Sequence, residues 1–174
     1  MAKLTLFGLA GTGTSTVGRA LAKNLSFQFI SNGDFTRAQA KELGLSLNEF
    51  DELCKTDNKY DLDRDAMVVE YGRTHDNFLA EGRLPWHFIP DSLKIKLDCD
   101  FDTRIKRVAQ REHITFEQAK QNTIAREEAI RIRFLNSYNI ADCADNAHFN
   151  LIVDTTHVSA VEVIAKIEKY VRGM

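Results

Sequence analysis

The sequence of 174 residues has few of the residues that build metal centres or disulfide frameworks. Its three cysteines, Cys54, Cys99 and Cys143, are far apart and odd in number, and no C-x-x-C pair occurs. The five histidines also lack the spacing of a metal site. We therefore expect neither a zinc site nor a disulfide framework. We expect instead that the cysteines are reduced and packed, in a cytoplasmic protein.

Long hydrophobic runs and an excess of one charge are also missing. No apolar run approaches the roughly 18 residues that a membrane span needs. The opening residues MAKLTLFGLAG become rich in glycine too soon for a signal peptide. The formal net charge is −2, so no broad basic field indicates nucleic acid or an anionic membrane as a partner. Any phosphate binding has to come from local arginine clusters.

What the chain does have is an alternation of short apolar runs and helical patterns. Its length predicts one domain, with residues 1–174 as a single unit. Five short apolar segments are expected to be strands covered on both faces: Leu4–Leu9, Phe27–Ile30, Asn77–Ala80, Leu93–Leu97 and Leu151–Val153. Strands that alternate with helices predict an α/β fold with a mainly parallel central sheet.

Helix start signals divide the segments between these strands. Ser46, Thr115 and Ser159 are each followed three residues later by Glu or Gln, which predicts three capping boxes. Gly44 stands where a helix over residues 34–43 should end. Helices at about 34–43, 46–56 and 61–74 then precede the third strand, and two more lie within residues 102–138. Two helical inserts therefore interrupt the alternation of strands and helices.

The first strand leads into a glycine-rich turn and a helix, in the stretch KLTLFGLAGTGTSTVGRALAKNL. Gly8 and Gly13 meet the spacing G-x-x-x-x-G of a phosphate-binding loop, and Ser15 meets the position that holds Mg²⁺. The lysine expected between them is absent, because position 14 is Thr. Backbone N–H groups and the helix N-terminus can still bind an anion there. The alternative is a strand-to-helix turn that is merely rich in Gly and Thr.

Several segments in the same order resemble the nucleoside monophosphate kinases, and most closely the short, archaeal-type cytidylate kinases. After the loop GLAGTGTSTVGRALA these segments are FISNGDFTRAQAKELGLSLNEF, the EGR at Glu81–Arg83, LKIKLDCDFDTRIKRVAQRE, TFEQAKQNTIAREEAIRIRF, SYNIADCAD and FNLIVDTT. The resemblance covers nearly the whole chain. It implies a three-layer P-loop NTPase fold with an acceptor-binding insert at about 31–75 and an arginine-rich lid at about 113–135. That family often carries Thr in place of the loop lysine.

The resemblance also implies a donor site for ATP with Mg²⁺ as cofactor. The residues expected to hold the ATP phosphates are Gly8, Gly11, Thr12, Gly13, Thr14, Ser15 and Thr16. Ser15 and Glu81 are expected near the metal. Ser31, Asp34 and Arg37 match the stretch that closes on the acceptor, and Arg83 would grip the acceptor phosphate.

Three arginines match the lid helix of similar kinases: Arg126, Arg131 and Arg133. Arg126 and Arg133 are seven residues apart and share one helix face, whereas Arg131 lies to one side. Converging cations stabilise a transferring phosphoryl group and could replace the missing lysine. The alternative is an exposed, charged helix. The family often continues Arg-Tyr after these arginines, and here Arg133 is followed by Phe134.

Other positions have two interpretations. Arg107 and Arg111 are weak candidates for the donor side, because they share with Arg104 a helix face that could equally be solvated. Asp61 and Asp65 could accept from a cytosine amino group, or could belong to a capping cluster. Trp86 and His87, which follow Arg83, are expected to be packing residues that could also wall the acceptor pocket.

The sequence therefore predicts ATP-dependent phosphorylation of a pyrimidine nucleoside monophosphate, CMP or dCMP first. The expected partners are small nucleotides, and a monomer is favoured. Two alternatives stay open, a P-loop kinase of another small metabolite and a nucleotide-binding module without turnover.

Overall fold

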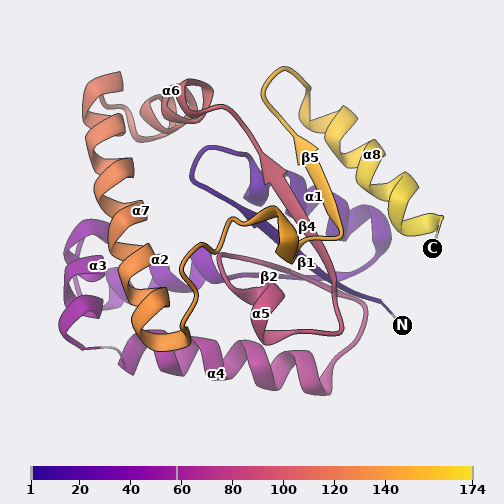
Figure 1. The fold of residues 1–174 in the computed structure, drawn as a ribbon, viewed down its shortest axis with the longest axis horizontal. Helices are drawn as coiled ribbons and strands as arrows, with labels where there is room; N and C mark the ends of the chain where they lie inside the picture. The colour runs from indigo at the N-terminus through magenta and orange to yellow at the C-terminus, as the bar shows by residue number, and fades with distance from the viewer. Residues whose placement is uncertain (1, 58, 174) are drawn as a thin grey trace.

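A single five-stranded sheet forms the centre of the fold in the computed structural model, which describes residues 2–57 and 59–173 and the side chains of all but 48 and 55 of these (Figure 1). The strands are β1 (Lys3–Gly8), β2 (Gln28–Ser31), β3 (Phe78–Glu81), β4 (Leu93–Asp98) and β5 (Leu151–Asp154). Their order is β2-β3-β1-β4-β5, and every neighbouring pair is parallel. The five expected strands and the parallel α/β fold are confirmed.

Helices fill the connections between the strands. They are α1 (Thr14–Leu25), α2 (Asn32–Glu42), α3 (Leu47–Thr56), α4 (Lys59–Thr74), α5 (Pro85–Phe88), α6 (Phe101–Glu112), α7 (Phe116–Tyr138) and α8 (Ala160–Arg172), with the 3₁₀ turn η1 at Asn146–His148. The helices α2, α3 and α4 all lie between β2 and β3, and α6 and α7 lie between β4 and β5, as the start signals predict. Within the described part of the chain, no helix is long and apolar enough to cross a membrane.

The predicted helix ends are confirmed in detail. Ser46, Thr115 and Ser159 each form a complete capping box with the residue three positions later. Gly44 follows α2 with φ +69°, a left-handed conformation that suits glycine at the end of a helix.

The largest hydrophobic cluster holds α1 and α8 against the sheet. Leu21 of α1 and Ile167 of α8 are fully buried there with Leu4, Leu6 and Leu97 of the strands. Figure 1 shows α8 on the opposite side of the molecule from α7. This packing gives the strand ends a rigid base, since burial of such apolar side chains is the main favourable term in folding.

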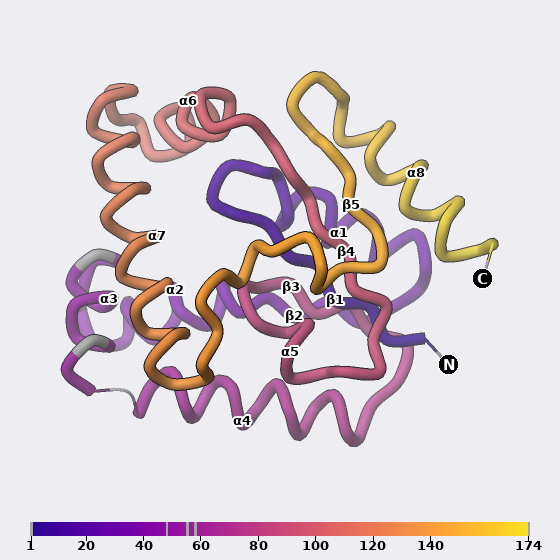
Figure 2. Tube along the Cα trace, in the orientation of Figure 1, coloured from indigo at the N-terminus to yellow at the C-terminus, as the bar shows by residue number. Residues whose placement is uncertain are grey.

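The helix α5 is an element that the sequence did not predict. Pro85 begins this short helix, and Trp86 packs into a cluster with Phe7 and Leu84. The segment between α7 and β5 completes this cluster through Phe149, and Figure 2 shows that segment crossing the sheet before it enters β5. Trp86 is thus a packing residue, the reading expected from the sequence.

Candidate active site

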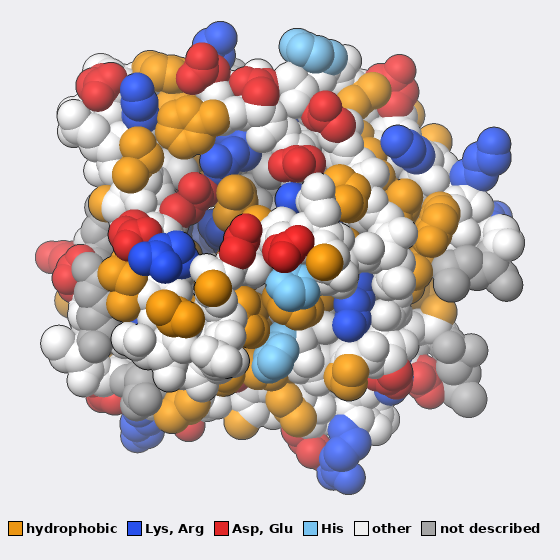
Figure 3. Space-filling model, in the orientation of Figure 1, with side chains coloured by type: hydrophobic (Ala, Val, Ile, Leu, Met, Phe, Trp, Pro, Cys, Tyr) orange, Lys and Arg blue, Asp and Glu red, His pale blue; other side chains and the backbone are white. Residues whose placement is uncertain are grey.

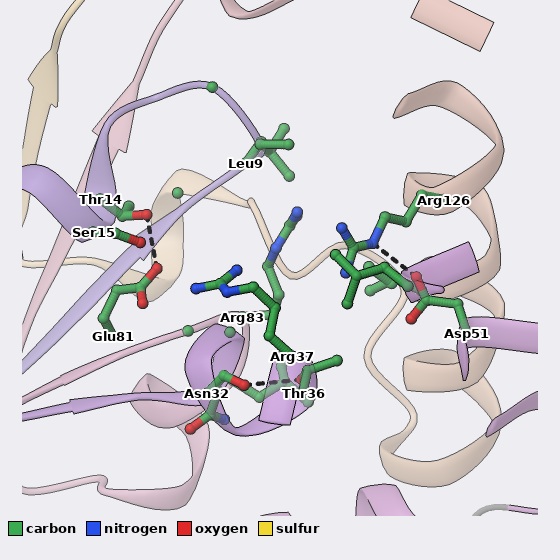
Figure 4. Close-up of a pocket in the computed structure, with 18 of the residues that line it drawn as sticks. Leu9, Thr14, Ser15, Asn32, Thr36, Arg37, Asp51, Glu81, Arg83 and Arg126 are labelled. Atoms are coloured by element: carbon green, nitrogen blue, oxygen red, sulfur yellow. Dashed lines mark hydrogen bonds and ion pairs between the residues drawn. The ribbon is translucent and has the colours of Figure 1, made fainter. Parts of the chain in front are cut away.

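A cavity of about 680 Å³ lies at the carboxyl ends of the parallel strands, where ligands bind in open α/β sheets. The loop after β1, the N-terminal part of α2, the helices α3 and α4, and the segment after β3 form its walls, and α6 and α7 close it. Figure 4 shows the loop on one side of this space and α7 on the other. Segments that are far apart in the sequence therefore meet here.

The loop from Gly8 to Thr16 has the backbone of an anion site. Gly11 and Gly13 have φ values of +87° and +92°, which L side chains rarely adopt. A Cβ at Gly11 would also lie 2.4 Å from the Arg104 carbonyl oxygen. Gly13 is the N-cap of α1 and provides no side-chain cap, so the first N–H groups of α1 remain available to an anion.

Most of the expected loop residues line the cavity. Those that do are Gly8, Gly11, Gly13, Thr14, Ser15 and Thr16. Thr12 does not, because it is buried and its hydroxyl donates to the Leu9 carbonyl oxygen at 2.8 Å. Its role is to hold the loop closed from inside.

Thr14 and Glu81 are joined across the donor side of the cavity. The Thr14 hydroxyl donates to Glu81 Oε1 at 2.8 Å (Figure 4), and the Ser31 hydroxyl donates to Glu81 Oε2 at 2.5 Å. Glu81 lines the cavity, whereas Ser31 lies behind it. The structure therefore does not bring Ser31 to the cavity surface as the resemblance implies.

Arg83 is a half-buried cation without a counterion. Within residues 2–57 and 59–173, its guanidinium forms no hydrogen bond and no ion pair. Burial lowers its pKa, and the neighbouring Arg126 and Arg104 act in the same direction, while Glu127 opposes them. Arg83 and Arg37 both point into the space between the loop and α7 (Figure 4). An unpaired guanidinium that faces a cavity is suited to an anionic ligand.

On the acceptor side, Asp34 supports Arg37 from outside. Arg37 lines the cavity, and its Nη2 donates to Asp34 Oδ1 at 2.6 Å. Arg19 binds the other oxygen of Asp34. Burial by itself would raise the pKa of Asp34, but the hydrogen bonds from Arg37 and Arg19 hold it below the usual range. Asp34 is not a lining residue, and it supports the cavity through Arg37.

The helix α7 contributes Arg126, Ile130, Arg133 and Phe134 on one face of the cavity. Arg126 lies 2.8 Å from the Asp51 carboxylate of α3, although that pair is not aligned for a hydrogen bond. Arg133 lies 3.2 Å from the Asp61 carboxylate of α4. Both pairs join α7 to the helices opposite.

Arg131 lies outside the cavity, contrary to its expected catalytic position. Its guanidinium is exposed and makes two hydrogen bonds of 2.8 Å with Glu128, on its own helix. The spacing explains this, because the cavity face repeats at intervals of three and four residues and Arg131 falls off that face.

Asp61 and Asp65 line the end of the cavity next to α4. Asp61 pairs with Arg64 and Arg133, so its carboxylate serves two guanidinium groups rather than the backbone of a cap. Asp65 accepts a hydrogen bond from Tyr138, the last residue of α7. Burial raises the pKa of Asp65, although that hydrogen bond lowers it.

The helix α6 supports the loop from behind. Arg107 donates to the Gly11 carbonyl oxygen at 3.2 Å and to the Thr155 carbonyl oxygen at 2.7 Å. Arg104 belongs to the face for which a solvated and a functional interpretation were both open, and for this residue the structure excludes the solvated one. Its guanidinium is buried between the Ala10 carbonyl oxygen and Glu127. Arg111 lines the cavity and pairs with Glu112.

Sequence reasoning missed several lining residues, among them Asn32, Thr36, Asp51 and Arg64. Asn32 and Thr36 follow the expected Ser31 on the first turns of α2, so their helical spacing was a usable signal. Asp51 and Arg64 had no such signal, because their partners lie on other helices. The face shown in Figure 3 carries side chains of both signs of charge.

The fold and the loop define the class of the protein. Solved structures with the same fold include an uncharacterised protein from Eubacterium ventriosum, with a TM-score of 0.75 and 17% identity over the whole of both chains. A shikimate kinase from Acinetobacter baumannii has a TM-score of 0.65 and 14% identity, over 99% of this chain and 94% of that one. These likenesses show that the chain shares its fold with shikimate kinases of known structure.

Sequence comparison gives the family. Residues 3–157 match the model of the cytidylate kinase-like family, and the chain belongs to that family. It is similar to the cytidylate kinase of Methanocorpusculum labreanum, at 35% identity over 99% of this chain and 97% of that protein. The cytidylate kinase of Thermococcus kodakarensis is 39% identical, over 88% of this chain and 79% of that protein.

Proposed function

We propose that this enzyme transfers the γ-phosphoryl group of ATP to a pyrimidine nucleoside monophosphate, forming CDP from CMP or dCDP from dCMP, and that it acts as a monomer. One observation carries the proposal. A single cavity joins the loop Gly8–Thr16 to the carboxylate and arginine side chains of α4, with unpaired Arg83 between them. Such a cavity can hold a triphosphate and a monophosphate end to end. Similarity to proteins named cytidylate kinase supports the choice of acceptor.

The donor end fits ATP and Mg²⁺ by its chemistry. The positive φ values and the uncapped start of α1 supply N–H donors for phosphate oxygens. Ser15 and Glu81 would hold Mg²⁺, since hydroxyl and carboxylate oxygens are ligands that this ion prefers. Bound Mg²⁺ would neutralise charge on the phosphates. Within the described chain no group of three or more His, Cys, Asp and Glu could hold a metal by itself.

Arginines supply the charge stabilisation in this proposal. Phosphoryl transfer has little covalent chemistry for a protein to do, so it depends on positioning and on stabilising negative charge. An oxygen of the acceptor phosphate attacks the γ-phosphorus, the bond to the β-phosphate oxygen breaks, and ADP leaves. Arg83, Arg126 and Arg133 line the cavity where this charge is spread. The lid at about 113–135 excludes water. Arg131 is not one of the arginines that stabilise the charge in this proposal.

The acceptor end is the insert at about 31–75. Arg37 is held towards the cavity by Asp34 and would bind the monophosphate. Asp61 and Asp65 supply carboxylate oxygens that could accept from the cytosine amino group. Ser31 acts from behind, as the N-cap of α2.

Coupled release of ADP with a panel of CMP, dCMP, UMP, AMP and GMP tests the proposal. Turnover with CMP or dCMP well above the others is expected. Turnover with none of them, while Mg·ATP still binds, would favour a kinase of another small metabolite or a module without turnover. Asp61→Asn and Asp65→Asn test base recognition, because an unchanged ratio of CMP to UMP turnover would remove these residues from it.

A further inference from the structure

Glu81 occupies a position that both sides of the cavity can reach. Its strand β3 lies between β1 and β2, and Glu81 is paired in register with Leu6 on one side and with Ser31 on the other. The loop that leads to Thr14 follows β1, and α2 follows β2. A side chain at the end of β3 can therefore contact the donor loop and the acceptor helix at once.

Two hydroxyl groups hold the Glu81 carboxylate. Thr14 donates to Oε1 at 2.8 Å, Ser31 donates to Oε2 at 2.5 Å, and all three residues are buried. No Lys, Arg or His of the described chain forms an ion pair with Glu81. The hydroxyl groups fix the orientation of the carboxylate but leave its negative charge in place.

The chain of hydrogen bonds continues into α2. The Ser31 hydroxyl accepts from the Asp34 N–H at 3.2 Å and so caps α2. The Asp34 carboxylate in turn holds Arg37, which faces the cavity. A continuous path thus runs from the first residue of α1 to a cation on the acceptor side.

A lysine at position 14 would change this arrangement. Its ammonium group would start from a buried position next to an unneutralised carboxylate. An ion pair between the two would be strong in these surroundings. This ion pair would keep the Glu81 carboxylate from binding a metal ion. It would also keep the lysine ammonium from binding the phosphates.

We propose that Thr14 is a positioning residue that acts through Glu81, and that the Thr14–Glu81–Ser31 bridge couples the donor loop to the acceptor helix. Thr14 therefore replaces the usual lysine by orienting a carboxylate, without supplying charge to the phosphates. The inference rests on the proposed function for the identity of the two nucleotides.

Three variants at position 14 test the bridge: Thr14→Ser, Thr14→Val and Thr14→Lys. Calorimetry measures the affinity for β,γ-imido-ATP with and without Mg²⁺, and steady-state kinetics give kcat and KM for CMP. Thr14→Ser keeps the hydroxyl and should stay within about threefold of the wild type. Thr14→Val should lower kcat/KM for CMP by about tenfold or more, since it removes a hydrogen bond to a charged acceptor. Its affinity for the ATP analogue without Mg²⁺ should change by less than about threefold, because Thr14 supplies no charge to the phosphates and Glu81 would act on the metal.

Opposite results would overturn the proposal. A direct role on phosphate predicts that Thr14→Val weakens the ATP analogue and leaves the CMP constants unchanged. If the absence of the loop lysine only weakens the enzyme, Thr14→Lys should raise turnover. If the Thr14–Glu81–Ser31 bridge is needed, Thr14→Lys should lower turnover. Thr5→Val is the matched control, because Thr5 is also buried and bonds the Ser92 hydroxyl at 3.0 Å, away from the cavity.

Ser31→Ala tests the other end of the bridge. It remains a test even where Thr14→Val fails to fold. It should reproduce the change in CMP constants, and the double variant should lose less than the two single losses combined, because both cut one path. Ser159→Ala removes an equivalent cap hydroxyl from α8 and should leave the kinetics unchanged. If the wild type does not use CMP, the proposed function fails. Non-additive losses of stability in urea then still support the bridge, and additive losses refute it.

Discussion

Arg83 combines partial burial with a positive charge that no ion pair of the described chain neutralises. Its guanidinium is half-buried, has no ion-pair partner in the described chain, and has a pKa lowered by burial. Burying a cation without a partner costs free energy. A residue that destabilises the fold while facing the cavity is typical of a functional site, where stability is given up for binding.

Arg83→Met should therefore separate stability from activity. We expect the free energy of unfolding in urea to rise by about 1 kcal/mol, since an apolar side chain replaces the unpaired cation. We expect kcat/KM for CMP to fall by at least about 100-fold, because charge stabilisation is lost. Arg73→Met is the control, since Arg73 is exposed and paired with Glu70, and neither quantity should change. A variant of Arg83 that is both less stable and fully active would contradict this account.

Asp65 gives a pH dependence that can be assigned to one residue. Its pKa in the folded protein is raised by burial above that of an unfolded aspartate. The folded state therefore holds the proton more tightly than the unfolded state. The contribution of Asp65 to stability is complete at low pH and is lost as the pH rises from about 3.9 through the raised pKa.

Asp65→Asn removes this loss, because the amide cannot ionise. The variant should be more stable than the wild type at pH 7, and the difference should shrink towards zero as the pH falls to about 4. Urea unfolding of both proteins between these pH values measures it. Asp63→Asn is the matched control, since Asp63 is exposed on the same helix. A stability difference that grows on acidification would reverse the sign and refute the assignment.

At the scale of elements, α7 has one face towards the cavity and one face towards solvent. Arg126, Ile130, Arg133 and Phe134 share the face towards the cavity, while Arg131 pairs with Glu128 in solvent. Arg126 and Arg133 meet carboxylates of α3 and α4, so α7 is joined to the opposite helices by charge. Phosphate groups in the cavity would compete with these carboxylates for the same guanidinium groups.

Arg126→Ala and Arg131→Ala should therefore have unequal effects. For Arg126→Ala we expect kcat to fall by about 100-fold or more and stability to fall by about 1–3 kcal/mol, because Asp51 is left unpaired. For Arg131→Ala we expect kcat within about threefold of the wild type, since an exposed pair contributes little. Steady-state kinetics and urea unfolding of both variants check this. Equal losses of kcat would place Arg131 in the reaction after all.

Strands and helix ends that depend on neighbouring residues could be predicted from the sequence. Side-chain contacts between distant elements could not. The strands and the capping boxes of Ser46, Thr115 and Ser159 depend on residues close in the chain. The short helix α5 lacks any periodicity to detect. The burial of Arg104 could not be predicted, because the groups that bury it, Ala10 and Glu127, come from two other segments. The same reason hid Asp51, whose partner is on α7.

At the scale of the whole molecule, two parts differ in how they are held. The large apolar cluster fixes α1 and α8 to the sheet. The contacts of α7 with α3 and α4 include the polar links of Arg126, Arg133 and Tyr138. Such links respond to charged ligands, whereas apolar packing does not. Movement on nucleotide binding is therefore expected in the second part.

Hydrogen exchange should reveal this division. With CMP and magnesium β,γ-imido-ATP both bound, exchange should slow by about tenfold or more in α3, in the first turns of α4 and in α7. In β4 and α8 it should change by less than about twofold, because their protection already comes from the buried core around Leu97 and Ile167. Cytidine, which lacks the phosphate, is the control and should give no protection in α7. Equal slowing in all elements would mean that the nucleotides stabilise the protein as one body, and that the charged links of α7 do not respond to phosphate.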